Sequence, residues 1–166
     1  MDLIIRKGSV VYSDADAIVN AANPQLQAGG GVCGAIFQAA GCDALARECD
    51  AIGGCKTGHA VMTDGYHLKA RHIIHTVGPS DKDSRKLKEA FYNTLVIADS
   101  NHMKTLAMVP VSVGIYGFPL PLCAKIAVKV IEEFPSESLK TCYMYCYTDA
   151  EYDAFVKAFR DYKEQN

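Results

Sequence analysis

Hydrophobic residues along the chain fall into two alternating patterns, short apolar runs and longer segments with apolar residues at helical spacing. Apolar runs flanked by turn residues are typical of strands, and the longer segments are typical of amphipathic helices. We expect strands at residues 3–5, 16–21, 57–63, 71–77, 105–111 and 141–147, and helices at residues 32–48, at residues 84–100, after Pro119 and after Thr148. This alternation predicts an α/β fold with a mostly parallel sheet between helices, and a ligand outside the carboxyl ends of the strands.

One stretch predicts a phosphate site. The apolar run from Ala17 to Ala22 ends at Asn23-Pro24, three glycines follow at residues 29–31, and an alanine-rich helix begins after them. Such a junction directs backbone N–H groups and the positive end of a helix dipole to one point, and glycines let a ligand approach the main chain. A plain glycine-rich surface turn is the alternative.

A second junction of the same kind comes later, where the strand at residues 105–111 is followed by Ser112 and the glycine-containing segment 113–119. It predicts a second place to hold phosphate. The spacing of Gly29, Gly31 and Gly34 also matches the G-x-G-x-x-G pattern of dinucleotide-binding folds. In those folds the first glycine directly follows the first strand. Here residues 23–28 lie between the apolar run and Gly29, so we rank the dinucleotide-binding interpretation lower.

Composition and charge narrow the class. The 166 residues, 49% hydrophobic and 22% charged, predict one globular domain over residues 1–166. The net charge of −2 and the scattered cations give no support for a nucleic-acid partner. No apolar run has membrane-spanning length and no signal-peptide core is visible, so we expect a cytoplasmic protein without a membrane partner.

The seven cysteines are an odd number, and Cys123, Cys142 and Cys146 lie inside apolar segments, so we expect small hydrophobic thiols and no disulfide framework. A group of possible zinc ligands lies close together in the sequence, so zinc binding remains an alternative: Cys42, Cys49, Cys55 and His59. None of its gaps is the short C-x-x-C of structural zinc sites, and we assign no metal and no cofactor. The remaining strand-region histidines, His67, His72 and His75, are interpreted together with His59 as core or strand-edge residues.

Four motifs together make the chain resemble the macro domain, the ADP-ribose-binding module, over almost its full length. They are Asp16-Ala17-Ile18-Val19-Asn20-Ala21-Ala22-Asn23-Pro24, Gly29-Gly30-Gly31-Val32, Ile74-His75-Thr76-Val77-Gly78-Pro79 and Gly114-Ile115-Tyr116-Gly117-Phe118-Pro119. The resemblance implies a three-layer α/β/α sandwich around a mixed six-stranded sheet, with a cleft for ADP-ribose above it.

The resemblance also implies roles for particular residues. Asn23 would contact the distal ribose, Tyr116 would pack on that ribose, and Tyr147 would stack on adenine, as a tyrosine face can do with a purine. The first and second glycine-rich loops would surround the diphosphate. The expected ligand-binding residues are Ser9, Val10, Asn23, Gly30, Gly31, Val32, Cys33, Ser112, Val113, Gly114, Ile115, Tyr116 and Tyr147.

Two departures from the family pattern bear on function. Where the family usually has Gly-Asp-Ile near the N-terminus, this chain has Gly8-Ser9-Val10. A charge-assisted hydrogen bond to adenine is then replaced by a neutral one, at a cost on the order of 1 kcal/mol. The hydrolytic MacroD-type branch carries an aspartate and a histidine where this chain has Cys33 and Phe37, neither of which orients or deprotonates water as a carboxylate does.

We therefore expect a module that binds ADP-ribose, or the ADP-ribosyl group of a macromolecule. The alternative is hydrolysis of an ADP-ribose ester, O-acetyl-ADP-ribose or ADP-ribosyl protein, by substrate-assisted attack of a water that Asn23 and the loops position. Catalytic residues stay unassigned, with Asn23 and Cys33 as candidates. Cys33 near a helix N-terminus is an alternative nucleophile, although we interpret it as a small space-filling residue.

Overall fold

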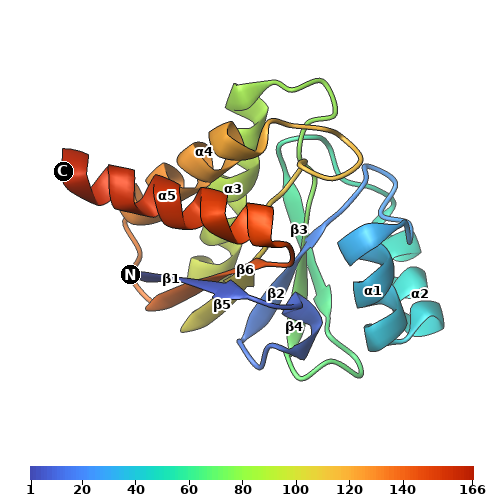
Figure 1. The fold of residues 1–166 in the computed structure, drawn as a ribbon. Helices are drawn as coiled ribbons and strands as arrows, with labels where there is room; N and C mark the ends of the chain where they lie inside the picture. The colour runs from blue at the N-terminus through green and yellow to red at the C-terminus, as the bar shows by residue number, and fades with distance from the viewer.

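Six strands form one mixed sheet at the centre of the fold (Figure 1). The computed structural model describes residues 1–166. The strands are β1 (Asp2–Lys7), β2 (Ala17–Ala21), β3 (Ala60–Asp64), β4 (His72–Thr76), β5 (Thr105–Met108) and β6 (Thr141–Cys146), in the order β1-β6-β5-β2-β4-β3. All neighbours are parallel except β3, which pairs antiparallel with β4 at one edge. The expected mostly parallel sheet is confirmed.

Helices cover both faces of this sheet. The helices are the 3-10 turn η1 (Val10–Tyr12), α1 (Gly31–Ala40), α2 (Cys42–Ile52), α3 (Ser84–Ser100), α4 (Leu120–Glu133) and α5 (Asp149–Gln165). α1 and α2 lie together on one side, and α3, α4 and α5 pack together on the other (Figure 1). This is the expected α/β/α sandwich. None of its helices has both the length and the apolar character that crossing a membrane requires.

The expected single helix at residues 32–48 is wrong, because Gly41 divides it into α1 and α2. Gly41 has φ of +106°, a backbone conformation that side-chain-bearing residues rarely adopt. A Cβ there would also lie 3.0 Å from the ring of His67, whose backbone N–H donates to Ala40 O. The break lets residues 66–68 reach the end of α1.

Two strands are shorter than the apolar runs predicted. β3 begins at Ala60 because Gly58, with φ of +88°, interrupts the extended backbone. β5 ends at Met108, and the segment from Val109 to Val111 leaves the sheet, where Pro110 has no N–H for a ladder bond. The helix expected after Thr148 is confirmed as α5, which begins with a capping box in which Thr148 and Glu151 each accept from the other's backbone N–H.

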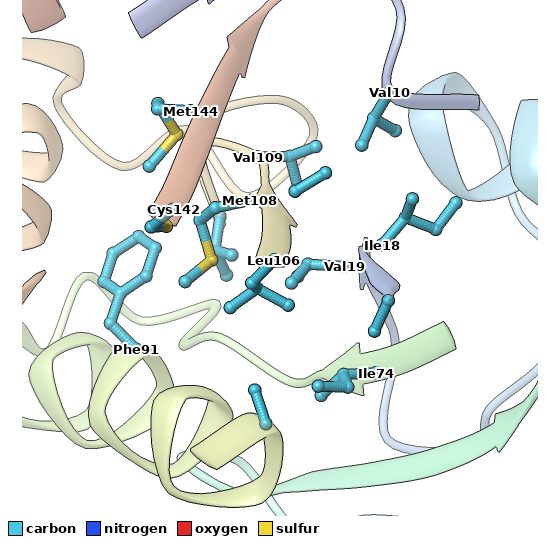
Figure 2. Packing of buried hydrophobic residues seen from close by; sticks show 14 of the residues in the cluster. Val10, Ile18, Val19, Ile74, Phe91, Leu106, Met108, Val109, Cys142 and Met144 are labelled. Atoms are coloured by element: carbon cyan, nitrogen blue, oxygen red, sulfur yellow. The ribbon is translucent and has the colours of Figure 1, made fainter. Parts of the chain in front are cut away.

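The hydrophobic core fills the space between the sheet and the helices on both faces. In Figure 2, Phe91 of α3 lies beside Cys142 and Met108, and Ile18, Val19 and Leu106 form the centre of the sheet. β6 alternates buried and half-buried residues, as a strand with one face in the core should. The expectation that Cys123, Cys142 and Cys146 pack as small hydrophobes is confirmed by their burial, which raises the pKa of each thiol.

Candidate functional site

The carboxyl ends of the parallel strands open onto one cleft of about 1030 Å³. Parallel strands end at the same edge of a sheet, so the segments that follow them are brought together there. Residues after β1, β2, β4, β5 and β6 all contribute to the lining, represented by Gly8, Asn23, Gly78, Val109 and Tyr147. The cleft therefore brings together residues from the whole length of the chain, because each of them follows the end of a strand.

The first glycine-rich loop presents an uncapped helix N-terminus to the cleft. α1 begins at Gly31 with Gly30 as its N-cap, and no side chain accepts a hydrogen bond from its first N–H groups. Gly30 and Gly31 are exposed, and a Cβ on either would meet no atom within 4 Å. Free N–H groups, open space and the positive end of the helix dipole together suit an anion.

Asn23 holds the shape of this loop. Its Nδ2 donates to Gln27 O at 2.9 Å, and Gln27 N donates back to Asn23 Oδ1 at 3.0 Å. Gln27 O also accepts a weak bond from Cys33 Sγ at 3.6 Å, which links the loop to the first turn of α1. The side chain expected to contact a ribose therefore also braces the loop that would surround the diphosphate.

Gly34 accounts for the last glycine of the G-x-G-x-x-G spacing. A Cβ at Gly34 would lie 2.4 Å from Gly29 O, so only glycine lets α1 pack this closely against its own loop. The dinucleotide-binding interpretation of this spacing is wrong, because the sheet order β1-β6-β5-β2-β4-β3 is not that of a dinucleotide fold.

The second loop, residues 112–117, faces the first across the cleft. It is held closed by Phe118 N, which donates to Ser112 O at 2.9 Å, and by Gly117 N, which donates to Gly114 O at 3.0 Å. Ser112 has φ of +71°, unusual for a residue with a side chain, and its Oγ is buried without a hydrogen-bond partner. Residues held in such sparsely populated backbone conformations cluster at active sites and ligand-binding loops.

Gly78 permits this arrangement from the neighbouring strand. It follows β4, and a Cβ there would lie 2.2 Å from Ser112 Oγ and 2.5 Å from Val111 Cγ1. The Gly78-Pro79 pair therefore does more than end a strand. It makes room for the second loop at the floor of the cleft.

A buried chain of polar side chains lies beneath the first loop. Asn20 Nδ2 donates to His75 Nδ1 at 3.0 Å and approaches Cys33 Sγ at 3.7 Å, while His75 Nε2 lies 2.9 Å from Thr63 Oγ1. Burial lowers the pKa of His75 to about 4, with the charge of Glu48 opposing the shift. His75 is therefore neutral at physiological pH, and with Nδ1 accepting from Asn20 its Nε2–H donates to Thr63.

The cleft contains little acid–base machinery. Its one lining carboxylate is Glu151, whose Oε1 accepts from Tyr147 N at 2.8 Å and Thr148 N at 3.3 Å as part of the α5 cap. Cys33 is buried in the first turn of α1 and reaches His75 only through Asn20. The arrangement can bind and orient an anionic ligand, and its one lining carboxylate is engaged in the α5 cap and not free to activate water.

Another part of the cleft lining combines an exposed tyrosine ring with one apolar and one polar residue. Tyr147 follows β6 with 75% of its surface exposed, and the apolar side chain of Val10 is buried nearby in the lining. Ser9 caps η1 by accepting a bond of 3.4 Å from Val11 N. An exposed ring beside an apolar wall is suited to stack a flat base.

The structure brings all of the expected ligand residues into the lining of this one cleft: Ser9, Val10, Asn23, Gly30, Gly31, Val32, Cys33, Ser112, Val113, Gly114, Ile115, Tyr116 and Tyr147. Their individual roles stay predictions. Sequence reasoning missed several lining residues, among them Tyr12, Gln38, Ala39, His67, Leu68 and Lys69. The exposed positions of α1 could be found by helical periodicity, whereas nothing in the sequence places residues 67–69 beside them.

The possible zinc ligands are not brought together. No group of three or more His, Cys, Asp or Glu side chains is arranged to hold a metal ion. Cys42 is exposed, whereas Cys49 is buried, and burial raises the pKa of the Cys49 thiol to about 11 and also raises that of Cys55. The Cys49 and Cys55 thiols are therefore protonated at physiological pH, and the protonated form does not favour binding of a metal ion.

A three-layer sandwich with two glycine-rich loops over one cleft defines a module for a phosphate-bearing ligand. The sequence model of the Macro domain family matches residues 19–127, and the chain belongs to this family. The O-acetyl-ADP-ribose deacetylase of Salmonella newport is 40% identical over 156 residues, covering 85% of this chain and 87% of that protein.

Solved structures of macrodomains are similar to this chain in fold. The Oceanobacillus iheyensis macrodomain with ADP has a TM-score of 0.93 and 28% identity, covering 98% of this chain and 92% of that one. The Trypanosoma brucei macrodomain in complex with ADP-ribose has a TM-score of 0.87 and 38% identity, covering 93% of this chain and 68% of that one.

Proposed function

We propose that the cleft binds ADP-ribose or the ADP-ribosyl group of a macromolecule. The observation that carries this proposal is the pairing of the uncapped N-terminus of α1 with the strained loop at Ser112 across one cleft. Two such loops offer backbone N–H groups to a diphosphate from both sides. The similar macrodomains solved with ADP and with ADP-ribose support the same ligand class.

The proposed pose follows from the two ends of the cleft. The diphosphate lies between Gly30–Val32 and Ser112–Tyr116, with Cys33 in the wall. Asn23 and Tyr116 contact the distal ribose, while adenine stacks on Tyr147 beside Ser9 and Val10. Ser9 has a hydroxyl where the family has a carboxylate, so it offers adenine only a neutral hydrogen bond.

Gly30 provides the sharpest test, because its φ of −85° allows any residue and its Cβ position is open. Gly30→Glu would place a carboxylate near the diphosphate, and two like charges about 4 Å apart repel by about 4 kcal/mol near a protein surface. Calorimetry should therefore detect ADP-ribose binding to the parent and to Gly30→Ala, but not to Gly30→Glu.

Ala51→Glu is the control. It adds the same charge at an exposed residue of α2, outside the cleft lining, where the helical backbone accepts a side chain without strain. It should leave ADP-ribose affinity unchanged. Micromolar binding retained by Gly30→Glu would remove the diphosphate assignment, and tighter binding of NAD than of ADP-ribose would favour a dinucleotide ligand.

A second candidate function is hydrolysis of an ADP-ribose ester, favoured by the name of the Salmonella relative. With Glu151 engaged in the helix cap, the route is attack by a water that Asn23 and the loops position and that the substrate helps to activate. Release of acetate from O-acetyl-ADP-ribose, or of ADP-ribose from a modified protein, measured by mass spectrometry, would support this function. Binding without turnover of either substrate would leave the binding module.

We further propose that residues 1–166 form one macro domain and that the protein works in the cytoplasm. The second proposal rests on its seven unpaired cysteines, one of them exposed, which a reducing compartment keeps as thiols. Cell fractionation with an antibody to the protein tests it, and recovery in an oxidising compartment would contradict it.

A further inference from the structure

Strand β1 leaves one edge of the sheet without a neighbour (Figure 1). Asp2 N donates to Lys140 O at 2.8 Å, so the even-numbered residues of β1 direct their backbone groups toward β6. In a parallel ladder the residues between them point the other way. The N–H and C=O groups of Leu3, Ile5 and Lys7 are therefore directed outward, where no backbone group pairs with them.

The opposite edge of the sheet, at β3, is better protected. Asp64 N donates to Glu48 Oε1 at 3.1 Å, and β3 also packs against α2 and α3. Most residues of β1 are exposed, whereas most residues of β3 are partly or fully buried. A strand edge that is left open in this way is a template for pairing with a further strand.

The side chains on one face of β1 suit a second copy of the same strand. Leu3 is buried toward α4 and α5, so Asp2, Ile4 and Arg6 lie on the opposite face of the strand. Ile4 has 38% of its surface exposed, and neither Asp2 nor Arg6 takes part in an ion pair. Arg6 lies 4.5 Å from the centroid of the Tyr143 ring, which holds the guanidinium on this face. An acidic, an apolar and a basic residue therefore follow one another along it.

Backbone geometry limits how two antiparallel copies of β1 can pair, because the outward groups of one copy must meet those of the other. The two longest overlaps that satisfy this condition are centred on Ile4 and on Ile5. Centring on Ile4 lets Leu3 and Ile5 exchange hydrogen bonds with Ile5 and Leu3 of the other copy, and it places Asp2 opposite Arg6 at both ends. Centring on Ile5 places Ile4 opposite Arg6 and leaves Asp2 without a charged partner. Opposite charges on directly opposed residues stabilise a strand pair, so charge complementarity favours the register centred on Ile4.

We propose that β1 is the interface of a weak homodimer with twofold symmetry, in which two copies of β1 pair antiparallel about Ile4 and make one continuous sheet. The net charge of −2 on each chain is small, so long-range repulsion opposes this association little. Residues 2–6 lie outside the cleft lining, so the interface does not depend on the proposed ligand. Because the strands run in opposite directions, the clefts of the two copies open in opposite directions too.

Sedimentation velocity at a series of concentrations measures the association. The interface is one short strand from each copy, so the average mass should rise from one chain to two between roughly 10 µM and roughly 1 mM. Ile4→Lys places two cations opposite each other at the twofold axis and should raise the dissociation constant of the dimer at least about tenfold. Its Tm at low concentration should stay close to the parent value, because Ile4 is exposed.

A charge exchange tests the register. Arg6→Asp and Asp2→Arg each place like charges opposite one another, and each should weaken the dimer. Combining Asp2→Arg with Arg6→Asp restores opposite charges and should return the dissociation constant to within about threefold of the parent. Arg85→Asp is the matched control: it makes the same change at an exposed residue of α3 and should leave the dimer unchanged.

A disulfide reports the same register by distance. Opposed residues without mutual hydrogen bonds in an antiparallel pair have Cα atoms about 4.5 Å apart, which lies within the range that a disulfide spans. The measurement is made in the Cys42→Ser background, which removes the exposed native thiol. With oxidised glutathione, Ile4→Cys should form a covalent dimer, whereas Arg6→Cys, which lies opposite Asp2, should not.

A mass of one chain at about 1 mM would overturn the interface, as would a dimer that persists unchanged in Ile4→Lys. Failure of the charge exchange to recover the dimer, or a covalent dimer of Arg6→Cys and not of Ile4→Cys, would overturn the pairing about Ile4. ADP-ribose affinity is a separate readout, and it should be the same in Ile4→Lys as in the parent because Ile4 lies outside the cleft lining.

Discussion

Acidification should destabilise this protein through His75, well before its carboxylates are titrated. The pKa of His75 is lowered to about 4 by burial, whereas an unfolded histidine has a pKa of about 6.5. Between these values the unfolded state binds more protons than the folded state, so the free energy of unfolding falls as pH falls. Stability that is fully present above about pH 6.5 is lost progressively down to about pH 4.

The size of the effect follows from the two pKa values. Relative to neutral pH, His75 should remove about 2 kcal/mol of unfolding free energy at about pH 5, and about 3 kcal/mol at about pH 4. For a chain of this length, the loss at about pH 5 corresponds to a decrease in Tm of about 4–8 °C. Asp99, whose pKa is lowered by backbone donors from Leu139, Ser138 and Glu137, adds its own loss only at lower pH.

Urea unfolding at several pH values between about 7 and about 5 measures this slope. His75→Gln should be less stable at neutral pH, because the Asn20 and Thr63 partners lose their ring, but its stability should depend much less on pH. His59→Gln, which removes an exposed histidine, should retain the parent slope. Identical slopes for the parent and His75→Gln would refute the assignment of a buried neutral imidazole beneath the first loop.

Three further changes address the cleft. Tyr147→Ala should weaken ADP-ribose by roughly 1–3 kcal/mol, while Tyr147→Phe should be close to neutral in calorimetry; equal losses would show that the hydroxyl matters and not the ring face. Gly34→Ala should lower the unfolding free energy by about 1–3 kcal/mol, because its Cβ would lie 2.4 Å from Gly29 O, and thermal unfolding that leaves Tm unchanged would contradict this. Cys33→Ala should leave both ligand affinity and any ester hydrolysis within a few fold of the parent, whereas lost turnover at unchanged affinity, with iodoacetamide inactivation, would make Cys33 a nucleophile.

Local chemistry in the sequence determined most of the elements and both loops. Apolar periodicity located α3 at its observed bounds, and Thr148 and Glu151 marked the start of α5, because helix spacing and capping are interactions between near neighbours. The glycines after β2 and β5 predicted bare backbone beside helix starts for the same reason. Four motifs, read together, were enough to indicate the family that the Macro domain match then showed.

Tertiary packing decided what depends on residues far apart in the chain. The divided helix at Gly41 reflects the approach of His67, and the need for glycine at position 78 reflects the approach of Ser112. The same is true of the low pKa of His75, which requires burial of its ring in the folded core, and of Lys69, which enters the cleft only because residues 66–68 reach the end of α1. Neither periodicity nor capping carries information about such contacts, because they form only when the sheet brings the strand ends and their connections together.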